Sequence, residues 1–125
     1  MNDNHSLSLR FAIALVLAIV CFVVPAWANY QAGMDAYSRG DYAKALREWQ
    51  PLAEQGDARA QFYLGLLYEN GDGVPRDFAK ARQWYEKSAA QGEAKAQFYL
   101  GIQSAYGEGG PLDLVQAHMW YSLAA

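Results

Sequence analysis

An eleven-residue stretch occurs twice in this chain, and it constrains the fold more than any other feature of the sequence. Residues 55–65 read Gln-Gly-Asp-Ala-Arg-Ala-Gln-Phe-Tyr-Leu-Gly, and residues 91–101 repeat them thirty-six positions later with nine of eleven identical. The two changes, Asp57 to Glu93 and Arg59 to Lys95, keep the charge. A period of roughly 20 to 50 residues is typical of proteins built from stacked units. The sequence therefore predicts a repeat protein.

The spacing of apolar residues predicts that the repeated units are helices. In residues 42–55 the apolar side chains stand three or four positions apart, at Tyr42, Ala45, Leu46, Trp49, Leu52 and Ala53. That spacing forms one buried stripe on a helix. Comparable patterns occupy residues 57–69, 78–91, 93–106 and 114–125, after a shorter helix at 30–39. The predicted fold class is therefore all-α, a solenoid of antiparallel helix pairs.

Turn, cap and core residues also recur at the period of thirty-six. Asp41, Asp77 and Asp113 precede predicted helices, where a carboxylate accepts backbone N–H bonds. Glycines in the turns and alanines in the helices match between copies, and the small residues let paired helices approach closely while aromatic rings fill the space beside them. The aromatic residues predicted to lie in the core are Tyr68, Trp84, Tyr85, Trp120 and Tyr121.

These strings resemble the Sel1-like repeat, a relative of the tetratricopeptide repeats. The resemblance rests on Ala-Gln-Phe-Tyr-Leu-Gly at 60–65, Gly-Asp-Gly-Val-Pro-Arg-Asp at 71–77 and Trp-Tyr-Glu-Lys-Ser-Ala-Ala-Gln-Gly at 84–92, and it covers residues 43–125. It implies a right-handed superhelix of helix pairs that binds other proteins, often in assembly or signalling. One turn departs from the pattern, because Ile-Gln-Ser-Ala-Tyr at 102–106 replaces Leu-Leu-Tyr-Glu-Asn at 66–70. This departure leaves the packing of the last pair open.

The first 28 residues form a separate segment. A polar start with Arg10 precedes an apolar run of fourteen residues at 11–24, and Pro25 and Ala-Trp-Ala at 26–28 follow. This order is typical of a secretory signal peptide cleaved after Ala28. The alternative is an uncleaved anchor, but a helix of that run spans only about 21 Å of a roughly 30 Å hydrocarbon core. We predict a periplasmic or secreted domain at 29–125, of about two and a half repeats, with no stable membrane insertion after cleavage.

Composition excludes several function classes for the mature chain. The single cysteine, Cys21, lies in the predicted signal segment, so no disulfide, thiolate metal site or cysteine nucleophile is expected in residues 29–125. His118 is the sole histidine there, and the serines have no recognisable catalytic base beside them. With a net charge of −3 and scattered basic residues, the chain lacks the basic stripe of a nucleic-acid binder. We predict no enzyme activity, cofactor, metal or nucleic-acid partner.

The expected function is that of a scaffold or adaptor in the cell envelope. By analogy with tetratricopeptide repeats, the first helix of each pair lines a concave groove that binds an extended or helical peptide. Eight residues would form this predicted binding face: Arg59, Phe62, Leu66, Glu69, Lys95, Phe98, Ile102 and Tyr106. The partner is an unidentified protein or peptide.

Two alternatives stay open at this point. Some exported Sel1-like proteins bind or hydrolyse β-lactams, so a peptidoglycan-related or β-lactam-related activity is the second function; this chain lacks the regularly spaced cysteine pairs of that group. The second question concerns the chain's end at Ala125, in an apolar helix without a polar cap of the kind that solenoids need for solubility. We expect either a C-terminal truncation or an interface open to a partner, which includes self-association.

Overall fold

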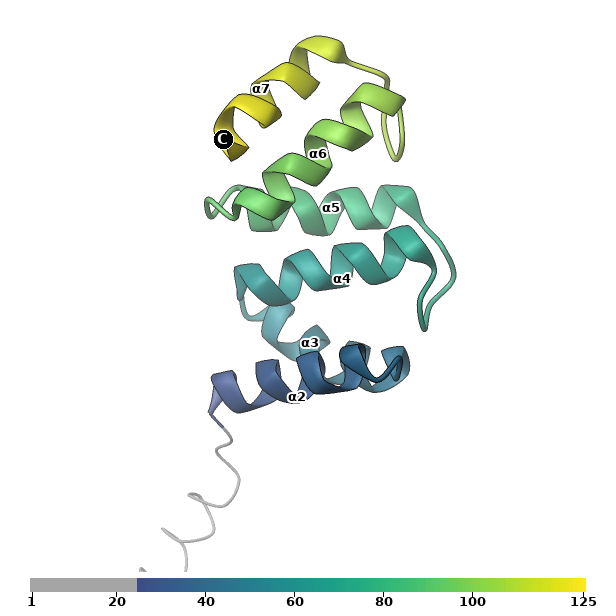
Figure 1. Ribbon diagram of the computed structural model, residues 1–125, viewed down its shortest axis with the longest axis vertical. Helices are drawn as coiled ribbons and strands as arrows, with labels where there is room; N and C mark the ends of the chain where they lie inside the picture. The colour runs from purple at the N-terminus through teal and green to yellow at the C-terminus, as the bar shows by residue number, and fades with distance from the viewer. Residues whose placement is uncertain (1–24) are drawn as a thin grey trace, which may run out of the picture.

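The computed structural model describes residues 25–125, and this part of the chain is made of helices stacked in chain order (Figure 1). The helices are α2 (Ala26–Ser38), α3 (Tyr42–Glu54), α4 (Ala58–Asn70), α5 (Phe78–Ala89), α6 (Ala94–Tyr106) and α7 (Leu114–Ala124). Each helix contacts the next along the chain, so α2 and α3, α4 and α5, and α6 and α7 form three successive pairs. The predicted all-α solenoid is confirmed for these residues.

Aspartates start four of these helices. The Oδ1 atoms of Asp41, Asp77 and Asp113 accept hydrogen bonds from backbone N–H groups three residues on, at 3.2, 3.0 and 2.9 Å. Asp57 does the same at the start of α4, with the N–H of Ala60 at 3.0 Å. The first N–H groups of a helix have no partner within the helix, so each of these bonds stabilises a start that the sequence predicts.

One glycine in each pair brings the two helices together. A Cβ added to Gly33 would lie 2.2 Å from Nε1 of Trp49, and a Cβ added to Gly65 would lie 2.4 Å from Cε1 of Tyr85. Gly101 repeats this against Tyr121, at 2.6 Å. Any larger residue would push the ring away, so glycine here sets the distance between paired helices.

The core consists of two clusters that follow the stacking. Trp49, Leu64 and Leu67 belong to the first, which joins α2 and α3 to α4 and reaches Trp84 of α5. Tyr85 and Leu100 belong to the second, which joins α4 and α5 to α6. Every helix pair thus covers one apolar side of the pair before it, as expected for a solenoid.

The predicted burial of the aromatic residues is confirmed at Trp84 and Tyr85 and is wrong at Tyr121. Trp84 and Tyr85 are buried, and Tyr68 and Trp120 are half-buried. The side chain of Tyr121 is 36% exposed. Its ring packs on Gly101, but within the described residues no further helix pair covers its other side. The same repeat position is therefore core in α5 and surface in α7.

The predicted signal peptide lies almost entirely outside the described residues. The structure includes residues 25–28 of it, and α2 begins at Ala26, before the predicted cleavage point. Among residues 25–125, no helix is long and apolar enough to cross a membrane. Cleavage after Ala28 stays a prediction.

Candidate interaction surface

The eight residues of the predicted binding face lie on α4 and α6, at helical spacings of three and four that place each group of four on one side of its helix. Arg59, Lys95 and Tyr106 are exposed. Leu66, Glu69 and Ile102 are half-buried. The face therefore exposes two basic side chains together with aromatic ones, and the binding role of its residues stays a prediction.

Phe62 and Phe98 occupy the same repeat position in opposite environments. Phe98 is 48% exposed, whereas Phe62 is 4% exposed and belongs to the core. The ring of Phe62 is enclosed by Tyr85 at 5.8 Å and by Tyr99 of the following pair at 5.5 Å between centroids. The prediction that Phe62 lies on an exposed binding surface is therefore wrong, because the neighbouring helix pair covers it.

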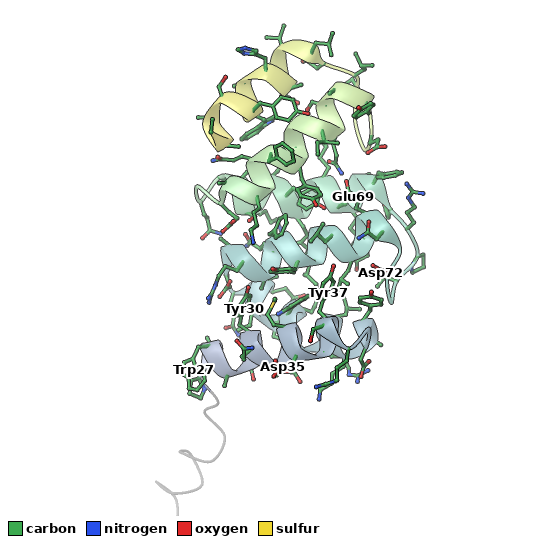
Figure 2. All side chains as sticks on the ribbon, viewed as in Figure 1. Trp27, Tyr30, Asp35, Tyr37, Glu69 and Asp72 are labelled. Atoms are coloured by element: carbon green, nitrogen blue, oxygen red, sulfur yellow. The ribbon has the colours of Figure 1, made fainter. Side chains whose placement is uncertain are left out.

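The sequence interpretation missed two tyrosines that join the helix pairs. Tyr63 stacks on Trp49, with ring centroids 4.7 Å apart, and Tyr99 lies 5.5 Å from Tyr85. Figure 2 shows Tyr30 and Tyr37 between α2 and α4, where both rings contact Tyr63. The repeat itself carried the signal, since these tyrosines stand thirty-six residues apart beside the phenylalanines.

A small hollow of about 140 Å³ brings the two basic residues of the face together. Arg59, Phe62 and Lys95 line it, along with Tyr30, Tyr63 and Glu93. The guanidinium carbon of Arg59 lies 4.1 Å from the centroid of the Tyr30 ring, a cation–π contact. Burial, and next the neighbouring Tyr63, raise the pKa of the Tyr30 hydroxyl to about 12, so this ring is neutral at physiological pH. The hollow thus has a neutral aromatic wall and a charged rim of two basic residues and one acidic residue, Glu93, and Arg59 also pairs with Asp57 at 3.4 Å.

Polar groups are buried where the third repeat departs from the pattern. Gln103 and Ser104 are fully buried at the places of Leu67 and Tyr68. Nε2 of Gln103 lies 3.5 Å from Oε1 of Glu69, and the hydroxyl of Ser104 donates to Oε1 of Gln116 at 3.1 Å. Hydrogen bonds thus stand here in place of the apolar contacts of Leu67 and Tyr68 one repeat earlier.

Glu69 stands at the centre of this polar region and lies near the end of α4 (Figure 2). Its Oε2 accepts a hydrogen bond of 2.8 Å from the hydroxyl of Tyr85. Burial raises the pKa of the Glu69 carboxyl above its ordinary value of 4.5, although the hydrogen bonds from Tyr85 and Gln103 oppose the shift. Burial and the Glu69 carboxylate together raise the pKa of the Tyr85 hydroxyl. Ionised Glu69 is therefore disfavoured in the folded state.

We expect the substitution Glu69→Gln to alter how stability depends on pH. Since the folded protein holds the Glu69 proton more tightly than the unfolded chain, this carboxyl contributes stability below pH 4.5 that is lost as the pH rises through its folded pKa. Urea unfolding of both proteins between pH 4 and pH 7 measures the effect. Relative to the unsubstituted protein, Glu69→Gln should gain stability as the pH rises.

The matched control is the change Glu54→Gln, because Glu54 is an exposed carboxylate on α3. Its free energy of unfolding should follow that of the unsubstituted protein over the whole range. A constant difference between Glu69→Gln and the unsubstituted protein from pH 4 to pH 7 would contradict the raised pKa.

Metal-binding residues are not gathered in the part of the chain that the structure describes. Within residues 25–125, no group of three or more His, Cys, Asp or Glu side chains could hold a metal ion. His118 is exposed on α7, and its backbone carbonyl accepts a hydrogen bond from Ser122 at 2.9 Å.

Comparison with known proteins decides the family. The model of the Sel1 repeat matches residues 58–93 and 94–125, which correspond to the second and third helix pairs. The chain belongs to the Sel1 repeat family. Its fold is typical of scaffolds for protein–protein interaction.

Two solved structures share the fold of this Sel1 repeat protein. One is a protective antigen of uropathogenic Escherichia coli with an SLR fold, similar at a TM-score of 0.75 and 34% identity over 79% of this chain and 22% of that one. The other is a Sel1 repeat protein from Oxalobacter formigenes, at a TM-score of 0.71 and 38% identity over 74% of this chain and 38% of that one.

Curated relatives match over a shorter length. DAP3-binding cell death enhancer 1 from Rattus norvegicus is 40% identical over 45 residues, and its counterpart from Mus musculus matches equally. These residues are 36% of this chain and 9% of either relative. The chain therefore spans about a tenth of the length of these relatives.

Proposed function

We propose that this Sel1 repeat protein is an exported, non-enzymatic scaffold of the cell envelope that binds a partner protein through the exposed part of α4 and α6. The observation that carries the proposal is the hollow in which Arg59 and Lys95 come from two successive repeats. Arg59 and Lys95 are exposed, and both have aromatic rings beside them. Such a surface suits a peptide with acidic and apolar side chains.

Because Phe62 is buried, the variants that test the proposal must be at other residues. Truncating Phe62 would open a cavity in the core, so a loss of binding could come from a loss of folding. The double change Arg59→Ala and Lys95→Ala removes exposed charge and leaves the core intact. Exposed Arg39 and Arg47, which are outside this hollow, provide a charge-matched control pair for the same double change to alanine.

We expect the Arg59→Ala, Lys95→Ala protein to lose its partner in the native envelope. Crosslinking followed by mass spectrometry would identify proteins captured by the unsubstituted chain, by this variant and by the Arg39→Ala, Arg47→Ala control. Capture lost only from the first variant supports the proposal. Equal capture by all three proteins would place the binding site elsewhere, and hydrolysis of a chromogenic β-lactam by the purified chain would contradict the non-enzymatic part.

Export is tested by the N-terminus of the protein recovered from cells. A sequence that begins at Asn29 in the periplasmic fraction or the medium is the expected result, since the signal pattern predicts cleavage after Ala28. Recovery in the membrane fraction with residues 1–28 attached would favour the uncleaved anchor instead.

A further inference from the structure

One part of the contact between the second and third helix pairs is polar where the contact between the first and second pairs is apolar. In the first contact, Leu46 of α3 and Tyr68 of α4 pack against the buried cluster that contains Leu67. Thirty-six residues later, the three matching positions carry polar side chains: Arg82, Ser104 and Gln103. We call this second contact the polar joint, and its residues are Glu69, Arg82, Tyr85, Gln103, Ser104 and Gln116.

Hydrogen bonds cross the polar joint, but they do not pair all of its polar atoms. Nη2 of Arg82 on α5 donates to Oε1 of Gln116 on α7. Among the described residues, the buried side-chain nitrogen and oxygen atoms without a hydrogen-bond partner are Nη1 of Arg82, Oε1 of Gln103 and Nε1 of Trp120. Trp120 packs against the core cluster beside the joint. Since burying a polar atom without a new partner costs free energy, we expect the polar joint to separate more easily than the first contact.

Glu69 is the carboxylic acid that the polar joint covers. It receives a hydrogen bond of 2.8 Å from Tyr85 on α5 and faces Nε2 of Gln103 on α6. Burial raises the pKa of this carboxyl, and the hydrogen bonds from Tyr85 and Gln103 lower it. Two charged residues in the adjacent turns act in opposite directions, because Glu108 after α6 raises this pKa and Arg76 before α5 lowers it. Separating α6 from α4 would return the Glu69 carboxyl to water.

We propose that the polar joint is a proton-controlled hinge, in which neutral Glu69 keeps α6 and α7 docked on α4 and α5 and ionised Glu69 favours their separation. The sign follows from hydration, because burial penalises a carboxylate more than it penalises the neutral acid. Acid therefore strengthens this joint. The first contact has an apolar cluster at the matching place and should not respond to pH in this way.

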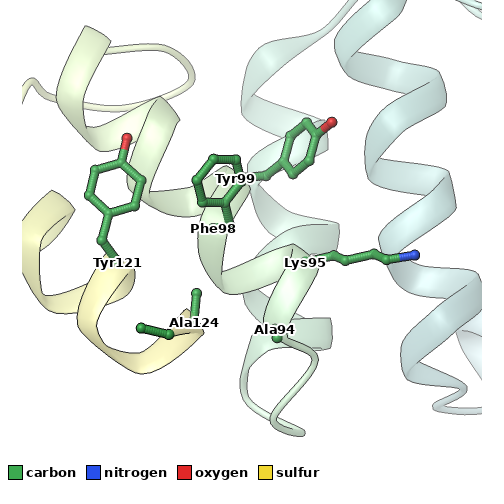
Figure 3. Close-up of a pocket in the computed structure, with 7 residues that line it drawn as sticks. Ala94, Lys95, Phe98, Tyr99, Tyr121 and Ala124 are labelled. Atoms are coloured by element: carbon green, nitrogen blue, oxygen red, sulfur yellow. The ribbon is translucent and has the colours of Figure 1, made fainter.

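The hinge would also control the hollow at which we propose that a partner binds. Arg59 belongs to α4 and Lys95 to α6, so the two cations come from opposite sides of the joint. Figure 3 shows Lys95 extending from α6 towards the preceding helices. Separation would take Lys95 away from Arg59, and binding should therefore be tighter at acidic pH. This consequence rests on the proposed function, whereas the hinge itself does not.

Hydrogen exchange measured by mass spectrometry on the purified full chain tests the hinge. Each exchange rate is divided into the intrinsic rate at the same pH, which gives a protection factor. We expect the protection factors of α6 amides to be about threefold or more higher at pH 4.5 than at pH 7. The protection factors of α3 amides should change less, because α3 contacts α4 through the apolar cluster.

Two variants and one control decide whether Glu69 is responsible. Glu69→Gln should remove the dependence of α6 protection on pH. Gln103→Leu introduces the residue found at the matching position, Leu67, and takes a hydrogen bond from ionised Glu69, so it should enlarge the dependence. The control Glu54→Gln, on exposed α3 surface, should behave as the unsubstituted chain does. Helical circular dichroism checks that each variant is folded.

Two results would overturn the hinge. One is an equal change of protection in α3 and α6, which would show that pH acts on unfolding of the whole array. The other is a dependence on pH that persists in folded Glu69→Gln.

The regulatory consequence is measured separately, by crosslinking in the envelope at pH 5 and pH 7. Capture through Arg59 and Lys95 should be about threefold stronger at pH 5 in the unsubstituted chain, and the difference should shrink in Glu69→Gln. Capture that is lost in Arg59→Ala, Lys95→Ala but is equal at both pH values would overturn control by the hinge and leave the proposed function standing. Hydrogen exchange needs no partner, so its result holds if the proposed function fails.

Discussion

Replacing Trp49 by alanine is expected to lower the free energy of unfolding by about 3 to 5 kcal/mol, the range for truncating a large core aromatic side chain. The indole is fully buried and stacks on Tyr63. Its Nε1 donates a hydrogen bond of 3.1 Å to the carbonyl of Tyr30. One residue thus holds α2 to α3 and supports the first helix of the next pair, and its loss leaves a cavity.

Urea unfolding monitored by circular dichroism would measure the change. The matched control is Trp27→Ala, since Trp27 is 70% exposed at the start of α2 and its truncation should leave the midpoint nearly unchanged. A Trp49→Ala protein with the unfolding midpoint of the unsubstituted chain would show that the first helix pair does not contribute to the stability of the array.

The second large effect is expected from Gly65→Ala, which should be less stable than Gly101→Ala by about 1 to 3 kcal/mol. Both glycines lie inside helices at the same repeat position, so each variant gains the same helix propensity, about 1 kcal/mol. The difference between them therefore isolates the clash. At Gly65 the new methyl group contacts Tyr85, which is fully buried and donates a hydrogen bond to Glu69. At Gly101 it meets Tyr121, which is partly exposed and can turn towards water.

Unfolding midpoints of the two variants, measured side by side, check this prediction. Gly101→Ala should match or exceed the stability of the unsubstituted protein, and Gly65→Ala should fall below it. Equal losses of stability in both variants would mean that α7 is held as rigidly as α5. Tyr121 would then have less room to move than its exposure indicates.

Local chemistry made most of the fold predictable. The helix starts at Asp41, Asp77 and Asp113 follow from the need of the first N–H groups for an acceptor, which a neighbouring residue can supply. The positive φ angles of Gly71 and Gly107 likewise end α4 and α6 in a conformation that few other residues adopt. The aspartate caps and the glycine helix ends both depend on residues only a few positions apart in the sequence. Their recurrence every thirty-six residues indicates that they are structural.

The candidate site was predictable only in part, because exposure depends on residues distant in the sequence. Phe62 and Phe98 stand in the same string of six residues, so no local argument distinguishes them. Tyr99 covers Phe62, and it belongs to a different helix pair. Arg59 and Lys95 keep their predicted exposure since their long side chains reach water from a half-covered helix.

The repeats and the apolar spacing determined by themselves that the chain is a helical solenoid, because this property follows from spacing and from contacts within one repeat. They did not give the start of the first helix, since α2 begins at Ala26 and not at the predicted Tyr30. The tertiary structure decided which copy of each residue faces water. Stacking buries Phe62 and Tyr85 under α6, whereas Phe98 and Tyr121 remain on the surface of the last described pair. Burial is a property of the neighbouring pair, so matching repeat positions lie in the core at one level of the stack and on the surface at the next.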